Sequence, residues 1–277
     1  MKQPTIHQRD LIVGLQKGLA LLQLFSQEHP RLSVPEVARM ADMTQSAARR
    51  FLLTLVHDDF AQTDGRFYWL TAKTLRIGQA YVDSAVLPRM LRPIVEQVAR
   101  TTQEHVSVGI RDGDDIVHVV RSRYSHITSM SIRPGARVPM YCTGSGRLWL
   151  ASLSGQALDG YFERNPPQAI TPYTLTDETR IRAEITLAAQ RGYVLVDQEY
   201  EVGMRVLSVP FIDREGQLQA ALTLTTHASR MTVEQMRDYM GATSLAFISV
   251  DGIYRAMGYD GRDGRSPQFT DHCFTGD

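Results

Sequence analysis

The sequence predicts an α+β protein with two domains of unequal size, and three observations lead to this prediction. The chain has 277 residues, too many for one small domain, and 43% of them are hydrophobic, enough for two cores. Residues 32–70 hold two short helical patterns, a turn and a hairpin pattern in close succession. After residue 104 the hydrophobic spacing changes from a helical period to alternation. We therefore expect a small helical domain, a linker helix and a larger mixed α/β domain.

The first of these domains, residues 11–71, is predicted to contain a winged helix-turn-helix. One helix over residues 34–41 begins after the expected N-cap Ser33. A second helix over residues 46–55 follows a short turn. An Asp-Gly pair at residues 64–65 then marks a hairpin turn between two short strands. Helix, turn, helix and hairpin in this order are typical of a winged helix.

The second helix carries a polar face with the donors that DNA accepts. Its apolar positions share the opposite face and are Ala48, Phe51, Leu52 and Leu55. Hydroxyl, amide and guanidinium groups near a helix start are suited to phosphates and base edges. Arg66, beside the hairpin tip, is placed to reach a phosphate. The predicted DNA-binding residues are Thr44, which caps the helix, and Gln45, Ser46, Arg49, Arg50 and Arg66.

Two other interpretations of this segment stay open. A basic amphipathic helix is commonly a solvated surface helix, and some winged helices bind protein rather than DNA. The order of elements around Arg49 and Arg50 favours the DNA-binding interpretation. Lysine plus arginine equals aspartate plus glutamate at 30 each, which argues against non-specific coating of nucleic acid and is compatible with one positive surface.

Further helices are predicted on either side of this segment. A helix over residues 11–28 is expected to pack behind it, with a core stripe of Leu15, Gly18, Leu19 and Leu22. Residues 72–87 form the expected linker helix, which Pro88 ends. The apolar positions Leu75 and Val82 of this helix have little to pack against in a small domain. We therefore expect the linker helix to contribute to a dimer.

The larger domain is predicted over residues 88–257, with a mobile Gly- and Asp-rich tail over residues 258–277. Its expected helices cover residues 91–102, 148–153, 154–164, 176–191 (capped by Thr176) and 231–254 (capped by Thr232). Its expected strands cover residues 104–110, 116–120, 129–133, 193–196, 206–212 and 218–226.

Two features of this domain suggest a ligand, and each has a structural alternative. Gly144 and Gly146 allow close approach of the backbone, and free N–H groups at the following helix start favour an anion. The same residues are equally typical of a tight turn that packs a helix on a sheet. Thr223 and Thr225 present two hydroxyls on one strand face, which suits a small polar ligand, or are ordinary strand residues.

Enzyme signatures are missing from the sequence. Ser145 lacks the preceding glycine of a nucleophile elbow, and there is no phosphate loop, dinucleotide fingerprint or HExxH pattern. No two of the eight histidines are four residues apart, so we expect neither a metal nor a cofactor. Asp197, Glu199 and Glu201 are more simply read as partners of arginines such as Arg205 than as acid–base catalysts. We expect no catalytic residue.

The cellular compartment is suggested by what the chain lacks. It has no run of 18 apolar residues and no apolar core of a signal peptide near its first residue. The two cysteines, Cys142 and Cys273, do not form a disulfide framework. A cytoplasmic protein without a membrane partner is the expectation.

Over residues 11–255 the chain resembles the IclR family of bacterial transcriptional regulators. The stretches that carry this resemblance are residues 13–22, 45–55, 64–71, 143–147 and 192–205. Residues 47–55 and 197–199 look most similar to the regulators of protocatechuate and 4-hydroxybenzoate catabolism. The resemblance implies a GAF-like effector-binding domain, a homodimer or homotetramer, and double-stranded operator DNA as partner. It also implies a small aromatic carboxylate effector, 4-hydroxybenzoate or protocatechuate.

The resemblance also points to the effector site. The candidate effector-binding residues are Tyr141, Thr143, Gly144, Ser145, Val196, Asp197, Met204, Val206, Thr223 and Thr225. Val206 stands where some relatives have a polar or thiol side chain, and an apolar residue there suits an aromatic ring better than a small keto acid. From strand alternation, Arg133 is a further candidate, to pair with a ring carboxylate.

The sequence thus predicts a ligand-responsive transcription factor, activator or repressor, for aromatic-acid catabolism. The alternative is an enzyme or small-molecule carrier whose winged helix contacts protein. Sequence-specific, salt-dependent DNA binding separates the two.

Overall fold

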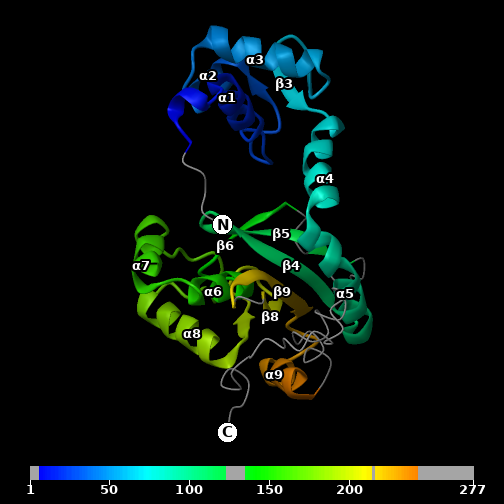
Figure 1. Ribbon diagram of the computed structural model, residues 1–277, viewed down its shortest axis with the longest axis vertical. Coiled ribbons are helices and arrows are strands. Elements are labelled where there is room, and N and C mark those ends of the chain that lie inside the picture. The colour runs from blue at the N-terminus through cyan, green and yellow to red at the C-terminus, as the bar shows by residue number, and fades with distance from the viewer. Residues whose placement is uncertain (1–5, 123–134, 214–215, 243–277) are drawn as a thin grey trace. The chain divides into compact units, whose positions relative to one another are not determined.

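The computed structural model of the chain describes residues 6–122, 135–213 and 216–242 (Figure 1). The chain divides into two compact units, Met1–Ser84 and Ala85–Asp277, and each is described by itself. The predicted strand at 129–133, the end of the last predicted helix and the tail at 258–277 lie outside the described residues.

The first unit is a winged helix-turn-helix, as predicted. Its helices are η1 (Gln8–Asp10), α1 (Val13–Leu22), α2 (Val34–Met40), α3 (Gln45–His57), η2 (Ala72–Thr74) and α4 (Leu75–Ser84). Its strands are β1 (Leu32–Ser33), β2 (Ala61–Thr63) and β3 (Phe67–Leu70), paired antiparallel in the order β1-β3-β2. The core residues include Leu21, Leu32, Val37, Ala48, Leu52 and Tyr68.

Local hydrogen bonds explain where these elements start and turn. The N–H and the hydroxyl of Ser33 both donate to the Glu36 carboxylate, at 2.7 and 2.6 Å, and this ties the start of α2. In the hairpin, Asp64 Oδ1 accepts the N–H groups of Arg66 and Phe67, and these bonds hold the pKa of Asp64 below its usual value. Gly65 has φ of +94°, a conformation that favours glycine.

Helix α1 departs from the prediction in length and in its buried face. It ends at Leu22 rather than near residue 28, because a turn closed by Ser26 and His29 follows it. Leu15 and Leu19, expected in the core, are 60% and 48% exposed, and the buried residue of the helix is Leu21.

The second unit is built on one antiparallel sheet. Its strands are β4 (His105–Asp112), β5 (Asp115–Arg121), β6 (Arg137–Pro139), β7 (Val194–Asp197), β8 (Met204–Ile212) and β9 (Leu218–His227). They are ordered β6-β5-β4-β9-β8-β7. Its helices are α5 (Val86–Thr102), α6 (Gly144–Ala151), α7 (Gly155–Arg164), α8 (Glu178–Arg191) and α9 (Val233–Ala242).

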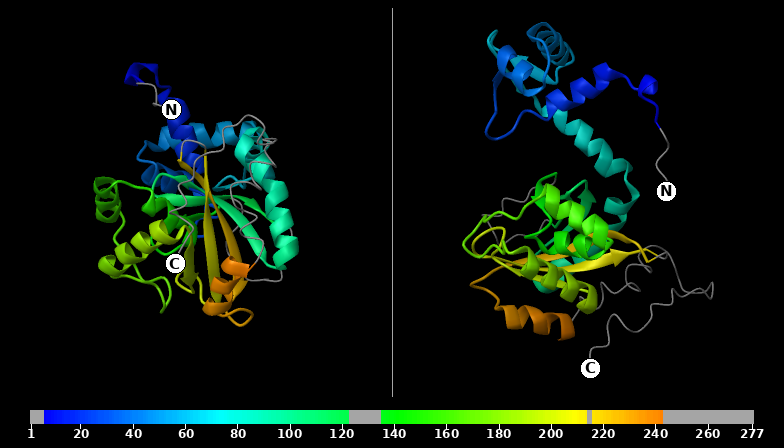
Figure 2. Two further views of the ribbon diagram at one scale, coloured as in Figure 1. Left: turned by 60° about the horizontal axis from the view of Figure 1, so that its bottom comes forward. Right: turned by 90° about the vertical axis from the view of Figure 1, so that its left-hand side faces the viewer.

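Helices cover both faces of this sheet (Figure 2). One core joins α5 and α9 to one face, through residues such as Val95, Val106 and Leu224. The other core joins α6, α7 and α8 to the opposite face, through residues such as Leu150 and Val206. This mixed α/β arrangement confirms the predicted fold class. Since neighbours along a strand point to opposite faces, each strand contributes to both cores.

The structure corrects three predicted helix boundaries. The linker helix ends before Ala85, which is the N-cap of α5, and not at Pro88. Pro88 lies in the first turn of α5, where a helix needs no N–H donor. Helix α6 begins at Gly144, four residues earlier than predicted, so the small residues form its first turn. Asp177, not Thr176, caps α8 by accepting the Arg180 N–H at 3.0 Å.

Candidate DNA interface and effector site

Helix α3 presents the predicted polar face to solvent. Gln45, Ser46, Arg49 and Arg50 are all exposed, whereas Ala48 and Leu52 are buried in the core of the first unit. The Thr44 hydroxyl accepts the Ala47 N–H at 3.2 Å and so caps the helix, as predicted. The arginine pair therefore points outward on a helix whose other side is fixed.

The cationic groups of this surface are available to a polyanion. Among the described residues neither Arg49 nor Arg50 forms an ion pair. Arg66 is exposed at the wing, with its guanidinium 5.1 Å from the centre of the Phe67 ring. The predicted DNA-binding residues thus lie on one exposed helix face and at the exposed tip of the wing.

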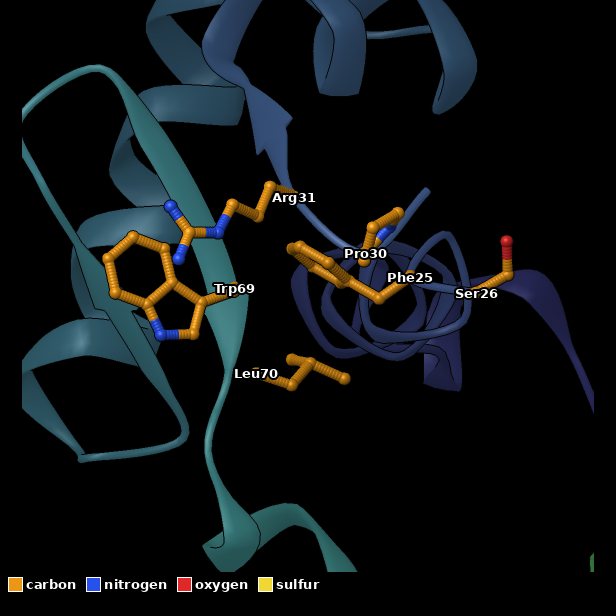
Figure 3. A pocket seen from close by; sticks show the side chains of 6 residues that line it. All are labelled: Phe25, Ser26, Pro30, Arg31, Trp69 and Leu70. Atoms are coloured by element: carbon orange, nitrogen blue, oxygen red, sulfur yellow. The ribbon is translucent and has the colours of Figure 1, made fainter. Parts of the chain in front are cut away.

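A hollow of about 390 Å³ lies behind the wing (Figure 3). Its lining residues are Phe25, Ser26, Pro30, Arg31, Trp69 and Leu70. The Arg31 guanidinium lies over the Trp69 ring, 4.3 Å from its centre, and its Nη1 is 3.9 Å from Asp64 Oδ2. These contacts join the loop before β1 to the wing, and none of the predicted effector residues is in this unit.

The predicted effector residues gather on the sheet face beneath α6. Val206 of β8 pairs with Val196 of β7 on one side and with Thr225 of β9 on the other. One step along, Thr223 pairs with Ser208, and their hydroxyl oxygens are 2.9 Å apart. The predicted residues that are buried on this side are Tyr141, Thr143, Gly144, Ser145, Val196, Met204, Val206, Thr223 and Thr225.

Helix α6 approaches this face as closely as its small residues permit. A Cβ atom on Gly144 would lie 2.4 Å from Ser208 Oγ and 3.2 Å from Val206 Cγ1. One on Gly146 would lie 2.3 Å from the Met140 backbone, so neither position has room for a side chain. The Thr143 hydroxyl donates to the Pro139 carbonyl, at 2.7 Å, and makes no cap bond with α6. The first N–H groups of α6 therefore have no side-chain cap from Thr143.

Asp197 differs from the other predicted effector residues because its side chain does not lie on the α6 face. Its carboxylate is bound by Arg205, with Nε to Oδ1 at 2.7 Å, and Arg205 also donates to the Met231 carbonyl before α9. The side chain thus lies on the opposite face from that of Val196, because neighbours along β7 alternate. Only the backbone of Asp197 is near the α6 face. Arg133 lies outside the described residues.

The acidic segment after β7 is held by a buried ion pair. Arg147, 1% exposed, donates through both Nη atoms to the two carboxylate oxygens of Glu199, each at 2.7 Å. Arg147 Nε also donates to the Tyr141 carbonyl, and the Leu175 N–H donates to Glu199. A bidentate pair with these extra bonds fixes α6 against residues 197–203. The structural interpretation of the carboxylates therefore holds for Asp197 and Glu199.

Several polar residues of the same face were missed by the sequence interpretation. They are His105, Ser107, His118, Arg121 and Ser208. His105 and Ser107 alternate with the buried valines of β4. The helices α6 to α8 cover the face that His105 and Ser107 share, so both sides of β4 are buried. His105 pairs with Thr225 and Ser107 pairs with Thr223, so a correct prediction of this strand pairing would have placed both residues on the effector face.

Two other classes of site are absent from the described residues. These residues contain no cluster of three or more His, Cys, Asp or Glu side chains arranged to hold a metal ion. They also contain no helix long and apolar enough to span a membrane. Burial raises the pKa of the Cys142 thiol to about 12, which leaves it a neutral core residue.

Both units match models of known domain families. Residues 14–65 match the IclR helix-turn-helix domain. Residues 79–246 match the bacterial transcriptional regulator IclR C-terminal domain. These two ranges contain the α3 surface and the sheet face under α6.

Relatives and solved structures agree with these matches. The chain is 33% identical to the Pca regulon regulatory protein of Pseudomonas putida, over 82% of this chain and 78% of that protein. It is 31% identical to the p-hydroxybenzoate hydroxylase transcriptional activator of Acinetobacter baylyi, over 84% and 88%. A transcriptional regulator of Rhodococcus is similar in structure, with TM-score 0.75, 32% identity and coverage of 90% and 99%. So is an IclR homolog of Microbacterium hydrocarbonoxydans complexed with 4-hydroxybenzoate, with TM-score 0.69, 20% identity and coverage of 88% and 99%.

Proposed function

Because this chain belongs to the IclR family of bacterial transcriptional regulators, we propose that it controls genes of aromatic-acid catabolism in response to such an acid. The effector is 4-hydroxybenzoate or protocatechuate. The observation that carries the proposal is the gathering of predicted effector residues on one buried sheet face, beneath a helix start that Thr143 does not cap. Two relatives above 30% identity are named as Pca and p-hydroxybenzoate regulators, which supports this class of effector.

The chemistry of that face fits an aromatic acid. The N-terminus of α6 carries a partial positive charge and N–H groups that Thr143 does not cap, which favour a carboxylate. Val206 and Val196 supply apolar surface for a ring beside it, and Thr223 and Thr225 supply hydroxyls. The complex of the Microbacterium hydrocarbonoxydans homolog supports the capacity of this fold to hold 4-hydroxybenzoate.

DNA is bound by the first unit in this proposal. Thr44, Gln45, Ser46, Arg49 and Arg50 enter the major groove at the start of α3, and Arg66 contacts a phosphate from the wing. The protein performs no catalysis. A homodimer or homotetramer places two or more copies of α3 on successive half-sites.

Exposed apolar side chains support self-association. On α4 they are Leu75, Ile77 and Tyr81, which are 75%, 49% and 44% exposed. On and before α1 they are Leu11, Ile12, Val13, Leu15 and Leu19. Apolar side chains clustered in this way mark association surfaces, and a second copy of the chain is the occupant that symmetry provides.

Calorimetric titration of the full chain with both acids tests the effector. Thr223→Val keeps the shape of the strand residue and removes its hydroxyl, so we expect binding at least about tenfold weaker, since a buried partner is lost. Thr226→Val, a buried change three residues further along β9, is the matched control and leaves binding unchanged. Equal binding by both variants, or no binding of either acid by the unaltered chain, would overturn the proposed effector.

A further inference from the structure

Two histidines with unpaired nitrogens lie on the α6 face of the sheet. His105 of β4 and His118 of β5 are 1% and 4% exposed. In each, Nδ1 is buried and has no hydrogen-bond partner among the described residues. Buried polar atoms are nearly always paired, so two such atoms in one region need an explanation.

The position of each histidine is set by strand pairing. His105 is opposite Thr225 in the neighbouring strand, and directly opposite residues share a face. His118 is opposite Gly109, and a Cβ atom on Gly109 would lie 3.3 Å from Ser145 Oγ of α6. Both histidines therefore belong to the face that holds the predicted effector residues.

The proton of His105 can be placed from its neighbour. Arg121 Nε donates to His105 Nε2 at 2.5 Å, and a guanidinium N–H can only donate. Nε2 is therefore the acceptor, and in the neutral ring the proton is on Nδ1. Burial, then the Arg121 charge, lowers the pKa of His105 to about 3, so the ring is neutral near pH 7. His105 Nδ1–H is a buried donor without an acceptor in the part of the chain that the structure describes.

The spacing across the sheet from Val206 to His105 suits one benzene ring. Gly144 lies against Val206 of β8, and His105 is two strands away in the same row, after Thr225. Two strand spacings amount to about 10 Å between Cα atoms. A ring with its carboxylate at the start of α6 then directs its opposite substituent toward His105.

We propose that His105 Nδ1–H donates a hydrogen bond to the ring hydroxyl of the effector, at the end opposite the carboxylate. This assignment rests on the proposed function, because it needs an aromatic acid on this face. It makes His105 a residue that selects hydroxylated benzoates over benzoate. A site built around a hydroxyl rejects the analogue that lacks it, since its own donor is then left unpaired.

The test is calorimetric titration of the full chain with 4-hydroxybenzoate and with benzoate, which differ only in that hydroxyl. The unaltered chain is expected to bind 4-hydroxybenzoate roughly ten- to hundredfold more tightly than benzoate. His105→Phe removes the donor, so we expect the ratio of the two affinities to fall to about one. Thr226→Val, the control, keeps the ratio of the unaltered chain.

Each other outcome decides against a specific claim. If His105→Phe weakens both acids equally and keeps their ratio, the carboxylate end or the scaffold depends on His105, and the assignment is wrong. If the unaltered chain binds neither acid, the proposed effector and the assignment both fail. Because His105→Phe can disturb folding, His105→Gln is measured beside it: an amide donor restores part of the ratio if the contact is real, and restores nothing if it is not.

Discussion

The buried ion pair between Arg147 and Glu199 illustrates how single residues stabilise the second unit. Glu199 neutralises Arg147 inside the protein, where an unpaired charge is costly. Sequence alone placed Glu199 in an acidic cluster and Arg147 after a small-residue turn, without joining them. They are 52 residues apart, and only the folded sheet brings them together.

Glu199→Gln tests this role. The change leaves Arg147 buried without its counter-charge, so we expect a loss of about 3–5 kcal/mol in the free energy of unfolding. In a Trp69→Phe background Trp149 is the one remaining tryptophan, and its fluorescence in urea reports the second unit. The control is Asp197→Asn, which removes the charge from the ion pair with Arg205. Because the Asp197 side chain is 40% exposed, we expect this change to lower the free energy of unfolding by at most about 1 kcal/mol. Equal losses in both variants would contradict the assignment.

His118 gives a prediction about pH. Burial, then the Arg121 charge, lowers its pKa from 6.5 to about 4 in the folded chain. Between these two values the unfolded chain takes up a proton that the folded chain does not, so stability falls as the pH falls below 6.5. His118→Phe removes this proton uptake and flattens the decline in the urea midpoint between pH 6.5 and 5. The exposed His57→Phe is the control, and a decline unchanged in His118→Phe would refute the prediction.

At the scale of elements, the sequence predicted most of the fold because its patterns were local. The caps at Ser33 and Thr44, the 64–65 hairpin and the strands β8 and β9 depend on neighbouring residues, and all are confirmed.

The sequence pattern could not predict the buried face of α1 or the start of α6, because both depend on residues that are distant in the sequence. Helix α1 is apolar on several sides, so its spacing fits more than one stripe, and the packing of Leu21 in the core selects the buried face. Gly144 and Gly146 look like a turn in sequence, and only the approach to Ser208 and Met140 explains a helix there.

Helix α3 carries the DNA prediction. Arg49→Ala removes an exposed guanidinium from the proposed recognition face, and we expect operator affinity to fall by roughly tenfold or more, since each base or phosphate contact contributes about 1–3 kcal/mol. Binding of the effector stays unchanged in calorimetry. Arg191→Ala removes the same charge from the exposed end of α8 and is the matched control. A gel shift in which Arg49→Ala binds as tightly as Arg191→Ala would exclude the proposed contact.

Helix α4 carries the association prediction. Ile77→Ser with Tyr81→Ser removes apolar surface that is exposed within one chain, so we expect a smaller oligomer at micromolar concentration. Sedimentation velocity of the full chain measures the change. Ile170→Ser, at a similarly exposed apolar position of the second unit, is the control. If the double variant sediments as the unaltered chain does, α4 is not part of the interface.

At the scale of the whole molecule, the two units have separate chemistry. The first holds exposed cationic donors on a winged helix, and the second holds a buried face of hydroxyls, imidazoles and apolar side chains. Regulation requires that occupancy of the second change the DNA affinity of the first, which is a coupling free energy between two sites.

The most direct test measures the affinity of the full chain for an operator duplex by fluorescence anisotropy. The duplex is first selected for binding to the full chain. It is then titrated with protein, once without the acid and once with the acid at a saturating concentration. We expect the acid that binds in calorimetry to change the operator Kd by about 5- to 150-fold. In Ser145→Leu, where the buried helix start is blocked, the acid has no such effect. An identical operator Kd with and without the bound acid would contradict the claim that the second unit controls the first.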